Sequence, residues 1–144
     1  MAQFREFRTS SGKRVFAGKT AENNEELVEQ AGKDEIVLHT KEPGSPFVNI
    51  KSPEKDVKKR DINEAGIICS PYSQDLNKSN KNKDIVVHVI KGKDMYKEKK
   101  MKTGTFGVRN KKEIKIKKQD IKDFEKDLNE QEEALEKFDK VNLA

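Results

Sequence analysis

The chain has 144 residues, of which 32% are hydrophobic and 40% charged, and its net charge is +5. This length and composition predict one domain with a small core, and no apolar run approaches the roughly 20 residues that a membrane-spanning helix needs. The single cysteine excludes an intrachain disulfide, and the N-terminus lacks the apolar run of a signal peptide, so we expect a cytoplasmic protein.

The first half of the chain alternates short apolar runs with turn residues. Four of these runs are predicted strands: residues 4–8, 14–17, 35–39 and 47–50. The first two flank a Ser-Ser-Gly turn, which indicates a hairpin. A helix is predicted over residues 20–30, with Thr20 as its cap and Gly32 as its stop.

The second half begins with a longer predicted helix. It starts at Ser52-Pro53-Glu54, a cap followed by a proline and an acid, and runs to about Ser70, just before Pro71. Cys69 lies on its apolar side and is interpreted as a small buried hydrophobe. The strongest strand signal of the chain follows at residues 84–90.

Two more strands, residues 106–109 and 113–117, are predicted to form a hairpin around Asn110. The second alternates apolar and basic residues, so one side should be buried and the other lined by lysine. Together the elements predict an α+β fold, a mostly antiparallel sheet with two or three helices and an additional C-terminal helix.

Residues 119–140 carry the pattern of that C-terminal amphipathic helix. Its apolar positions recur at heptad-like spacing: Ile121, Phe124, Leu128, Leu135 and Phe138. Two placements remain open for this helix, against the body of the protein or against a partner helix, which includes a second copy of the chain.

Charge is distributed unevenly along the sequence. Residues 1–118 carry a net charge of +10 and residues 119–144 carry −5, while residues 91–118 alone hold 12 Lys and Arg against 3 acids. A basic body indicates a polyanionic partner, because Lys and Arg neutralise phosphates and release their counterions. The alternative is a lysine-rich surface that only keeps the protein in solution.

The basic stretch supplies the candidate nucleic-acid contacts. Its cations can follow a phosphate backbone: Lys91, Lys93, Lys97, Lys99, Lys100, Lys102, Arg109, Lys111 and Lys112. The two tyrosines of the chain, Tyr72 and Tyr96, are the candidate rings for stacking on a base.

No group of residues points to catalysis. His39 and His88 each lie at the end of, or within, an apolar strand without an evident nucleophile, and both are interpreted as structural. One cysteine and two separated histidines do not make a recognisable metal site. The Gly-rich run at residues 104–107 lacks the Gly-Lys-Ser/Thr ending of a phosphate-binding loop. We therefore expect no enzymatic activity and no cofactor.

Short motifs spread over residues 3–118 occur in a definite order. They are Arg5-Glu6-Phe7-Arg8-Thr9-Ser10-Ser11-Gly12, Gly18-Lys19, Leu38-His39-Thr40-Lys41, Pro43-Gly44-Ser45 and Gly104-Thr105-Phe106. In this order they resemble the NFACT-R (NFACT RNA-binding) family, the RNA-binding module of ribosome-associated quality-control factors. Three positions depart from the family pattern: Glu25 replaces an Asp, Val37 a Trp, and Pro46 a His.

The resemblance implies a second set of RNA contacts outside the basic stretch: Arg5, Arg14, Lys19, His39, Lys41 and Ser45. The sequence thus predicts an RNA-binding domain over residues 1–118 and an acidic helix over 119–144. The expected partner is tRNA or ribosomal RNA, with the large ribosomal subunit as the implied location and a quality-control-like role. Two alternatives remain, a protein-interaction adaptor that acts through the C-terminal helix and a DNA-binding protein.

Overall fold

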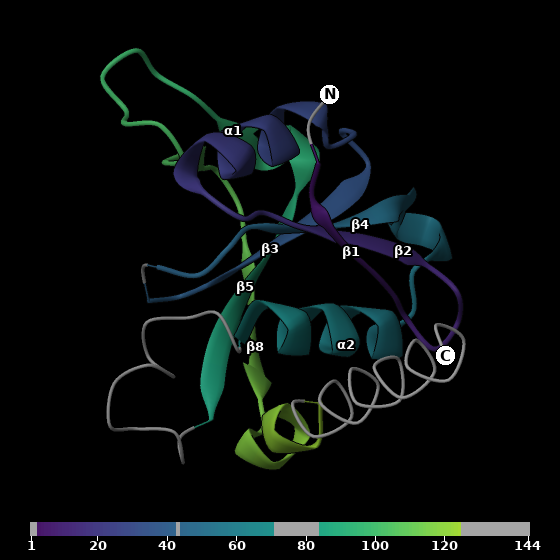
Figure 1. Cartoon of the computed structure of the whole chain (residues 1–144). Coiled ribbons are helices and arrows are strands. Elements are labelled where there is room, and N and C mark those ends of the chain that lie inside the picture. Colours follow the sequence, from purple (N-terminus) through teal and green to yellow (C-terminus); the bar gives the residue numbers. More distant parts are fainter. Residues whose placement is uncertain (1–2, 43, 71–83, 125–144) are drawn as a thin grey trace, which may run out of the picture.

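A computed structural model describes residues 3–42, 44–70 and 84–124 of the chain. Its main element is a six-stranded antiparallel sheet with the strand order β1-β2-β4-β3-β5-β8 (Figure 1). The strands are β1 (Arg5–Arg8), β2 (Arg14–Ala17), β3 (Glu35–Thr40), β4 (Val48–Pro53), β5 (Ile85–Lys91) and β8 (Lys112–Ile116). A separate two-stranded ribbon pairs β6 (Met95–Tyr96) with β7 (Gly107–Val108). The predicted α+β fold is confirmed.

Two helices cover opposite faces of the sheet, α1 (Ala21–Gln30) on one side and α2 (Lys59–Cys69) on the other (Figure 1). A third helical segment begins at residue 118 and is described as far as residue 124. Two short 3-10 turns, η1 (Glu54–Asp56) and η3 (Gly92–Asp94), also lie within the described residues. None of the helices in the described part of the chain has the length and apolar character needed to span a bilayer.

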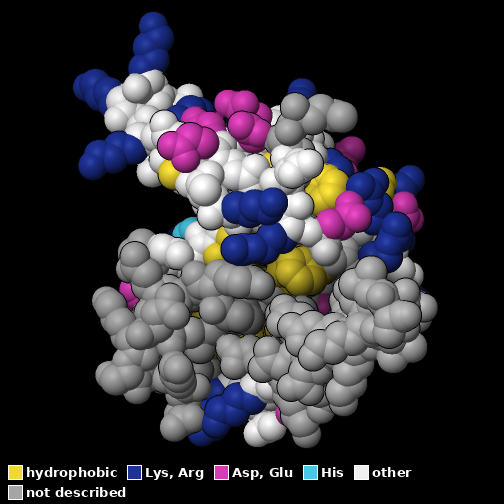
Figure 2. Space-filling view, in the orientation of Figure 1, with side chains coloured by type: hydrophobic (Ala, Val, Ile, Leu, Met, Phe, Trp, Pro, Cys, Tyr) yellow, Lys and Arg dark blue, Asp and Glu magenta, His cyan; other side chains and the backbone are white. Residues whose placement is uncertain are grey.

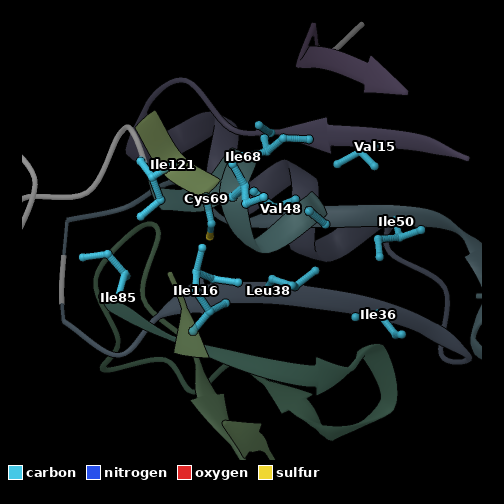
Figure 3. Close-up of a cluster of buried hydrophobic side chains, with 14 residues drawn as sticks. Val15, Ile36, Leu38, Val48, Ile50, Ile68, Cys69, Ile85, Ile116 and Ile121 are labelled. Atoms are coloured by element: carbon cyan, nitrogen blue, oxygen red, sulfur yellow. The ribbon is translucent and has the colours of Figure 1, made fainter. Parts of the chain in front are cut away.

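The larger core lies between the sheet and α2. Alternate residues of each strand point to this side, because successive side chains of a strand face opposite ways. The buried members are Val15, Ala17, Ile36, Leu38, Val48, Ile50, Ala65, Ile67, Ile68, Cys69, Ile85, Val87, Ile116 and Ile121. Figure 3 shows many of these side chains meeting between the sheet and the helix. Cys69 is fully buried, as predicted, and burial raises the pKa of its thiol to about 12.

The smaller core lies between the sheet and α1 and contains more aromatic residues. Leu27 and Val28 of the helix pack with Val37 and Phe47. Partly buried side chains from distant segments surround them: Phe4, Phe16, Ala31, Met95 and Phe106. The loop after β6 is therefore attached to α1 through Phe106.

The helix α1 begins where the sequence predicts. The Thr20 hydroxyl accepts a hydrogen bond from the backbone N–H of Asn23 at 3.1 Å, which caps the first turn. The predicted start of the second helix at Ser52 is wrong. Ser52 and Pro53 belong to β4, which extends alongside β3, and α2 begins only at Lys59.

The predicted hairpin over residues 106–117 is also wrong, although both strands exist. The β7 strand pairs with β6, whereas β8 pairs with β5 and places Ile116 opposite Ile85 and Ile114 opposite Val87. Burial of the two isoleucines on the α2 side therefore decides the pairing of β8. Its outward residues, Glu113 and Lys115, are exposed, and Lys115 is one of the lysines that the alternating pattern places on that side.

The C-terminal helix packs on the body where it is described. Ile121 is buried in the larger core, and the ring of Phe124 lies 6.2 Å from the ring of Phe7. The rest of the predicted helix, residues 125–140, lies outside the described residues.

Candidate nucleic-acid interface

Four segments that are far apart in sequence converge on one groove of about 470 Å³. They are Arg5 of β1, residues 18–21 at the start of α1, residues 44–46 in the turn between β3 and β4, and residues 103–104 in the loop between β6 and β7. Asn24 of α1 also lines the groove. Residues from four of the five motifs that the sequence resemblance rests on are thus brought together at one place, and the motif of residues 38–41 does not line the groove.

Backbone hydrogen bonds fix two of these segments to each other. The N–H of Gly18 donates to the carbonyl of Phe47 at 3.0 Å, and the N–H of Phe47 donates to Asn24 Oδ1 at 3.1 Å. Ser45 is buried, and its hydroxyl accepts from the N–H of Thr40 at 3.1 Å. Ser45 therefore shapes the wall of the groove through its hydroxyl.

A glycine is required where the segment of residues 103–104 approaches α1. Gly104 has a φ of 81°, in the left-handed region that other residues rarely adopt, and a Cβ there would lie 3.0 Å from the carbonyl oxygen of Ala21. Any other side chain at this position would be strained and would force the loop away from the helix.

Glu25 of α1 anchors the loop of residues 97–106. Its carboxylate accepts from the N–H of Gly104 at 2.6 Å and lies 3.0 Å from Lys97 Nζ. The Lys97 ammonium also donates to the carbonyl of Thr105 at 2.7 Å and lies 4.8 Å from the centre of the Phe106 ring. The ammonium group of Lys97 therefore makes intramolecular contacts that hold the loop in place. Sequence reasoning missed the role of Glu25, because its partners are more than 70 residues further along the chain.

The remaining lysines of this loop face solvent. Lys99, Lys100 and Lys102 are exposed, and within the described residues their side chains make no ion pair or hydrogen bond. Figure 2 shows Lys and Arg side chains projecting from the loop at the upper left of the molecule. An anchored loop with outward lysines places positive charge beside the groove.

Comparison with known proteins identifies the family of the chain. Residues 3–110 match the family described as the NFACT protein RNA binding domain. The chain belongs to this family. Membership supports a general RNA-binding role, with RNA as a partner, and fits a protein without catalytic activity.

One solved structure similar to this NFACT-R chain is the C-terminal part of the fibronectin/fibrinogen-binding protein from Streptococcus suis. The TM-score is 0.71 at 22% sequence identity, and the match covers 81% of this chain and 46% of the other. This likeness shows the fold, and the NFACT-R chain spans less than half of that solved chain. No curated protein matches.

The aromatic candidates of the NFACT-R chain are engaged within the fold. The His39 ring lies 4.4 Å from that of Phe47, and its Nδ1 lies 2.7 Å from the carbonyl oxygen of Thr40. The Tyr96 ring lies across Gly107, its partner in the ribbon, and the Arg109 guanidinium lies 5.0 Å from the ring centre. Tyr72 lies outside the described residues.

The other predicted contacts fall on separate parts of the surface. Two are paired with acids: Arg14 lies 2.7 Å from Glu6, and Lys91 lies 3.1 Å from Glu54. Four predicted lysines line a second groove of about 440 Å³ at the C-terminal end of β5: Lys91, Lys93, Lys111 and Lys112. Lys41 is exposed after β3, and Lys19 is exposed in the first groove. The predicted residues therefore form two basic regions.

Proposed function

We propose that this NFACT-R chain binds tRNA or ribosomal RNA through the groove of residues 18–21, 44–46 and 103–104 and the lysines of the adjoining loop. The observation that carries the proposal is that residues from four of the five dispersed family motifs meet at this groove, next to an anchored loop with three exposed lysines. Such lysines neutralise phosphates, and Lys19 and Arg5 extend the positive charge into the groove.

The mode of binding that this geometry supports is recognition of RNA shape. Lysine contacts to phosphates position a nucleic acid without specifying its sequence, and the aromatic side chains nearby are already used in packing. A folded RNA offers many phosphates at fixed spacing, which favours tRNA or a ribosomal RNA hairpin as the ligand.

The resemblance of the motifs to those of ribosome-associated factors supports a role at the large ribosomal subunit, and with it a cytoplasmic location. We assign the RNA contact to a domain of residues 1–118. The acidic segment of residues 119–144 is then an appendage whose beginning packs on that domain through Ile121 and Phe124. In the alternative function, that of a protein-interaction adaptor, this appendage binds a protein partner or a second copy of the chain.

The test measures binding of the purified chain to tRNA, to a ribosomal RNA hairpin and to duplex DNA over a series of salt concentrations. The test variant is Lys99→Glu/Lys100→Glu. Its matched control is Lys59→Glu/Arg60→Glu, which makes the same change in net charge in the first turn of α2, on the other side of the sheet. Acids are favourable in a first helical turn, so the control should fold normally.

We expect the wild-type chain to prefer the two RNAs and to lose affinity steeply with salt. The loop variant should bind at least about tenfold more weakly at low salt, with a shallower salt dependence, because each lost phosphate contact removes about 0.7–0.9 from the slope. The control variant should bind like wild type. Equal weakening by both variants, or equal affinity for RNA and DNA, would contradict the proposal.

A further inference from the structure

A row of titratable side chains crosses three strands on the α1 side of the sheet. His39 of β3 is the direct partner of His88 of β5, and His88 is the partner of Glu113 of β8. His88 Nε2 lies 3.3 Å from Glu113 Oε1, and 15% of the His88 side chain is exposed. The helix α1 packs mainly on β2 and β4, away from this row. Figure 2 shows a histidine side chain reaching the surface in the recess below the loop.

Exposed lysines surround the row. Lys41 follows β3, and its N–H donates to the carbonyl of Val86 at 2.9 Å, while Lys115 of β8 is the strand partner of Val86. These two lysines therefore belong to the row next to the histidines. Lys111 precedes β8 and is close enough to His88 to act on its charge. The three lysines outnumber Glu113, so an anion is favoured here even while both imidazoles are neutral.

The charged groups around the imidazoles act in opposite directions. Burial is the largest influence and lowers the pKa of His88; Lys111 and Lys41 lower it further, and Glu113 raises it. Burial likewise lowers the pKa of His39, the backbone at Thr40 and Ser45 raises it, and the neighbouring His88 lowers it.

Other charged groups stand at the ends of these strands. Asp84, at the start of β5, accepts a hydrogen bond from the N–H of Lys118 at 2.9 Å. Glu42 follows Lys41 in the turn after β3, and Glu25 is paired with Lys97. In the free protein near pH 7, His39 and His88 are therefore mainly neutral.

We propose that the row of His39, His88 and the lysines around them is a second RNA contact, in which a backbone phosphate lies over β3 and β5 and the histidines take up protons as it binds. The inference depends on the proposed RNA-binding function and adds a site and a pH dependence to it. A phosphate between two imidazoles and three ammonium groups supplies the negative charge that the free protein lacks there. The phosphate offsets the repulsion between a protonated imidazole and its positively charged neighbours, and this repulsion is what opposes protonation in the free protein.

The direction of the pH effect follows from linkage. Binding raises the histidine pKa values, so the RNA complex holds more protons than the free protein in the range between the free and bound values. Affinity therefore increases as the pH falls through that range and is constant above it. If one proton is taken up over about half of the interval, the affinity for tRNA should rise about tenfold between pH 7.5 and pH 5.5 at constant ionic strength.

The experiment measures tRNA affinity from pH 5.5 to 8.5 for wild type, for His88→Gln and for the loop variant Lys99→Glu/Lys100→Glu. His88→Gln should lose most of the increase in affinity between pH 8.5 and pH 5.5. The loop variant should bind more weakly at every pH and keep the increase. In parallel, the ring proton signals of both histidines should show higher pKa values when tRNA is added to the wild-type chain.

The outcomes separate this inference from the proposed function. RNA binding with the same pH profile in wild type and His88→Gln, or histidine signals that do not respond to tRNA, would overturn the second contact while the loop and groove still stand. No RNA binding at any pH would overturn both. If His88→Gln loses the pH dependence while Lys99→Glu/Lys100→Glu loses affinity at every pH, the two variants affect two separate RNA contacts.

Discussion

The two sides of the sheet differ in how they are built. The α2 side is closed by aliphatic residues, such as Leu38 and Ile116, that are fully buried. The α1 side has a smaller aromatic cluster, and around it lie the groove, the lysine loop and the two histidines. Most apolar burial therefore lies on the α2 side, whereas the proposed RNA-binding groove, its lysine loop and the two histidines lie on the α1 side. Core packing and the proposed RNA binding use opposite faces of the same strands. Substitutions on one face should therefore change stability, and substitutions on the other should change RNA affinity.

The largest effect is expected in the α2-side core. Leu38→Ala removes a fully buried side chain from the central strand β3 and should lower the free energy of unfolding by about 2–5 kcal/mol, measured by urea denaturation. Val86→Ala, a half-buried site on the α1 side of β5, should cost less than about 1.5 kcal/mol. Equal losses from the two substitutions would mean that both sides carry stability alike.

The next effect tests the polar link between α2 and the β1–β2 turn. Asp61 is buried and accepts hydrogen bonds from the Ser11 hydroxyl and, at 3.0 Å, from the N–H of Lys58. Asp61→Ala leaves these donors unpaired and should cost about 1–3 kcal/mol at pH 7.

This cost should depend on pH. Burial raises the pKa of Asp61, but hydrogen bonds from Ser11, Lys58 and Thr9 outweigh it, and the net pKa lies below the usual value of 3.8. The unfolded chain then binds the proton more readily, so the carboxylate stabilises the fold at neutral pH and loses this contribution as the pH falls below about 5. The difference in unfolding free energy between wild type and Asp61→Ala should therefore shrink at pH 3. A difference that stays constant would show that the hydrogen bonds do not favour the carboxylate.

Local patterns in the sequence predicted much of the fold. The β1–β2 hairpin, the Thr20 cap and the strands β3 and β5 all depend on residues that are close together in the chain, and all are confirmed. The start of α2 and the pairing of β7 were wrong, because each is decided by a distant partner. Extension of β4 along β3 takes Ser52 and Pro53 into the sheet, and Tyr96 takes Gly107 into the ribbon.

The candidate site shows the same division. Charge density in the sequence indicated the loop lysines, but it could not distinguish the braced Lys97 from the exposed Lys99, because only the fold places Glu25 beside one of them. The pairing of His39 with His88 likewise depends on the register of β3 against β5. No local pattern contains that register.

A substitution of Glu25 disturbs the α1 side while every candidate RNA-contact residue keeps its own side chain. Glu25→Ala removes the acceptor of Gly104 and the partner of Lys97, and should cost about 1–2 kcal/mol. Residues 97–106 should exchange their amide hydrogens faster, and RNA affinity should fall because the lysines are no longer held beside the groove. Glu25→Gln, which keeps a hydrogen-bond acceptor, serves as the milder control. Unchanged exchange in Glu25→Ala would show that Phe106 alone anchors the loop.

The smallest effect on stability is expected from the substitutions with the clearest effect on RNA. Lys99 and Lys100 are exposed and make no ion pair or side-chain hydrogen bond in the described part of the chain, so Lys99→Glu/Lys100→Glu should change the free energy of unfolding by less than about 0.5 kcal/mol. Urea denaturation beside an RNA titration measures both quantities on one sample. A loss of stability as large as that of Glu25→Ala would mean that the lysines support the loop itself. Weaker RNA binding at unchanged stability is the result that only a surface built for a polyanion predicts.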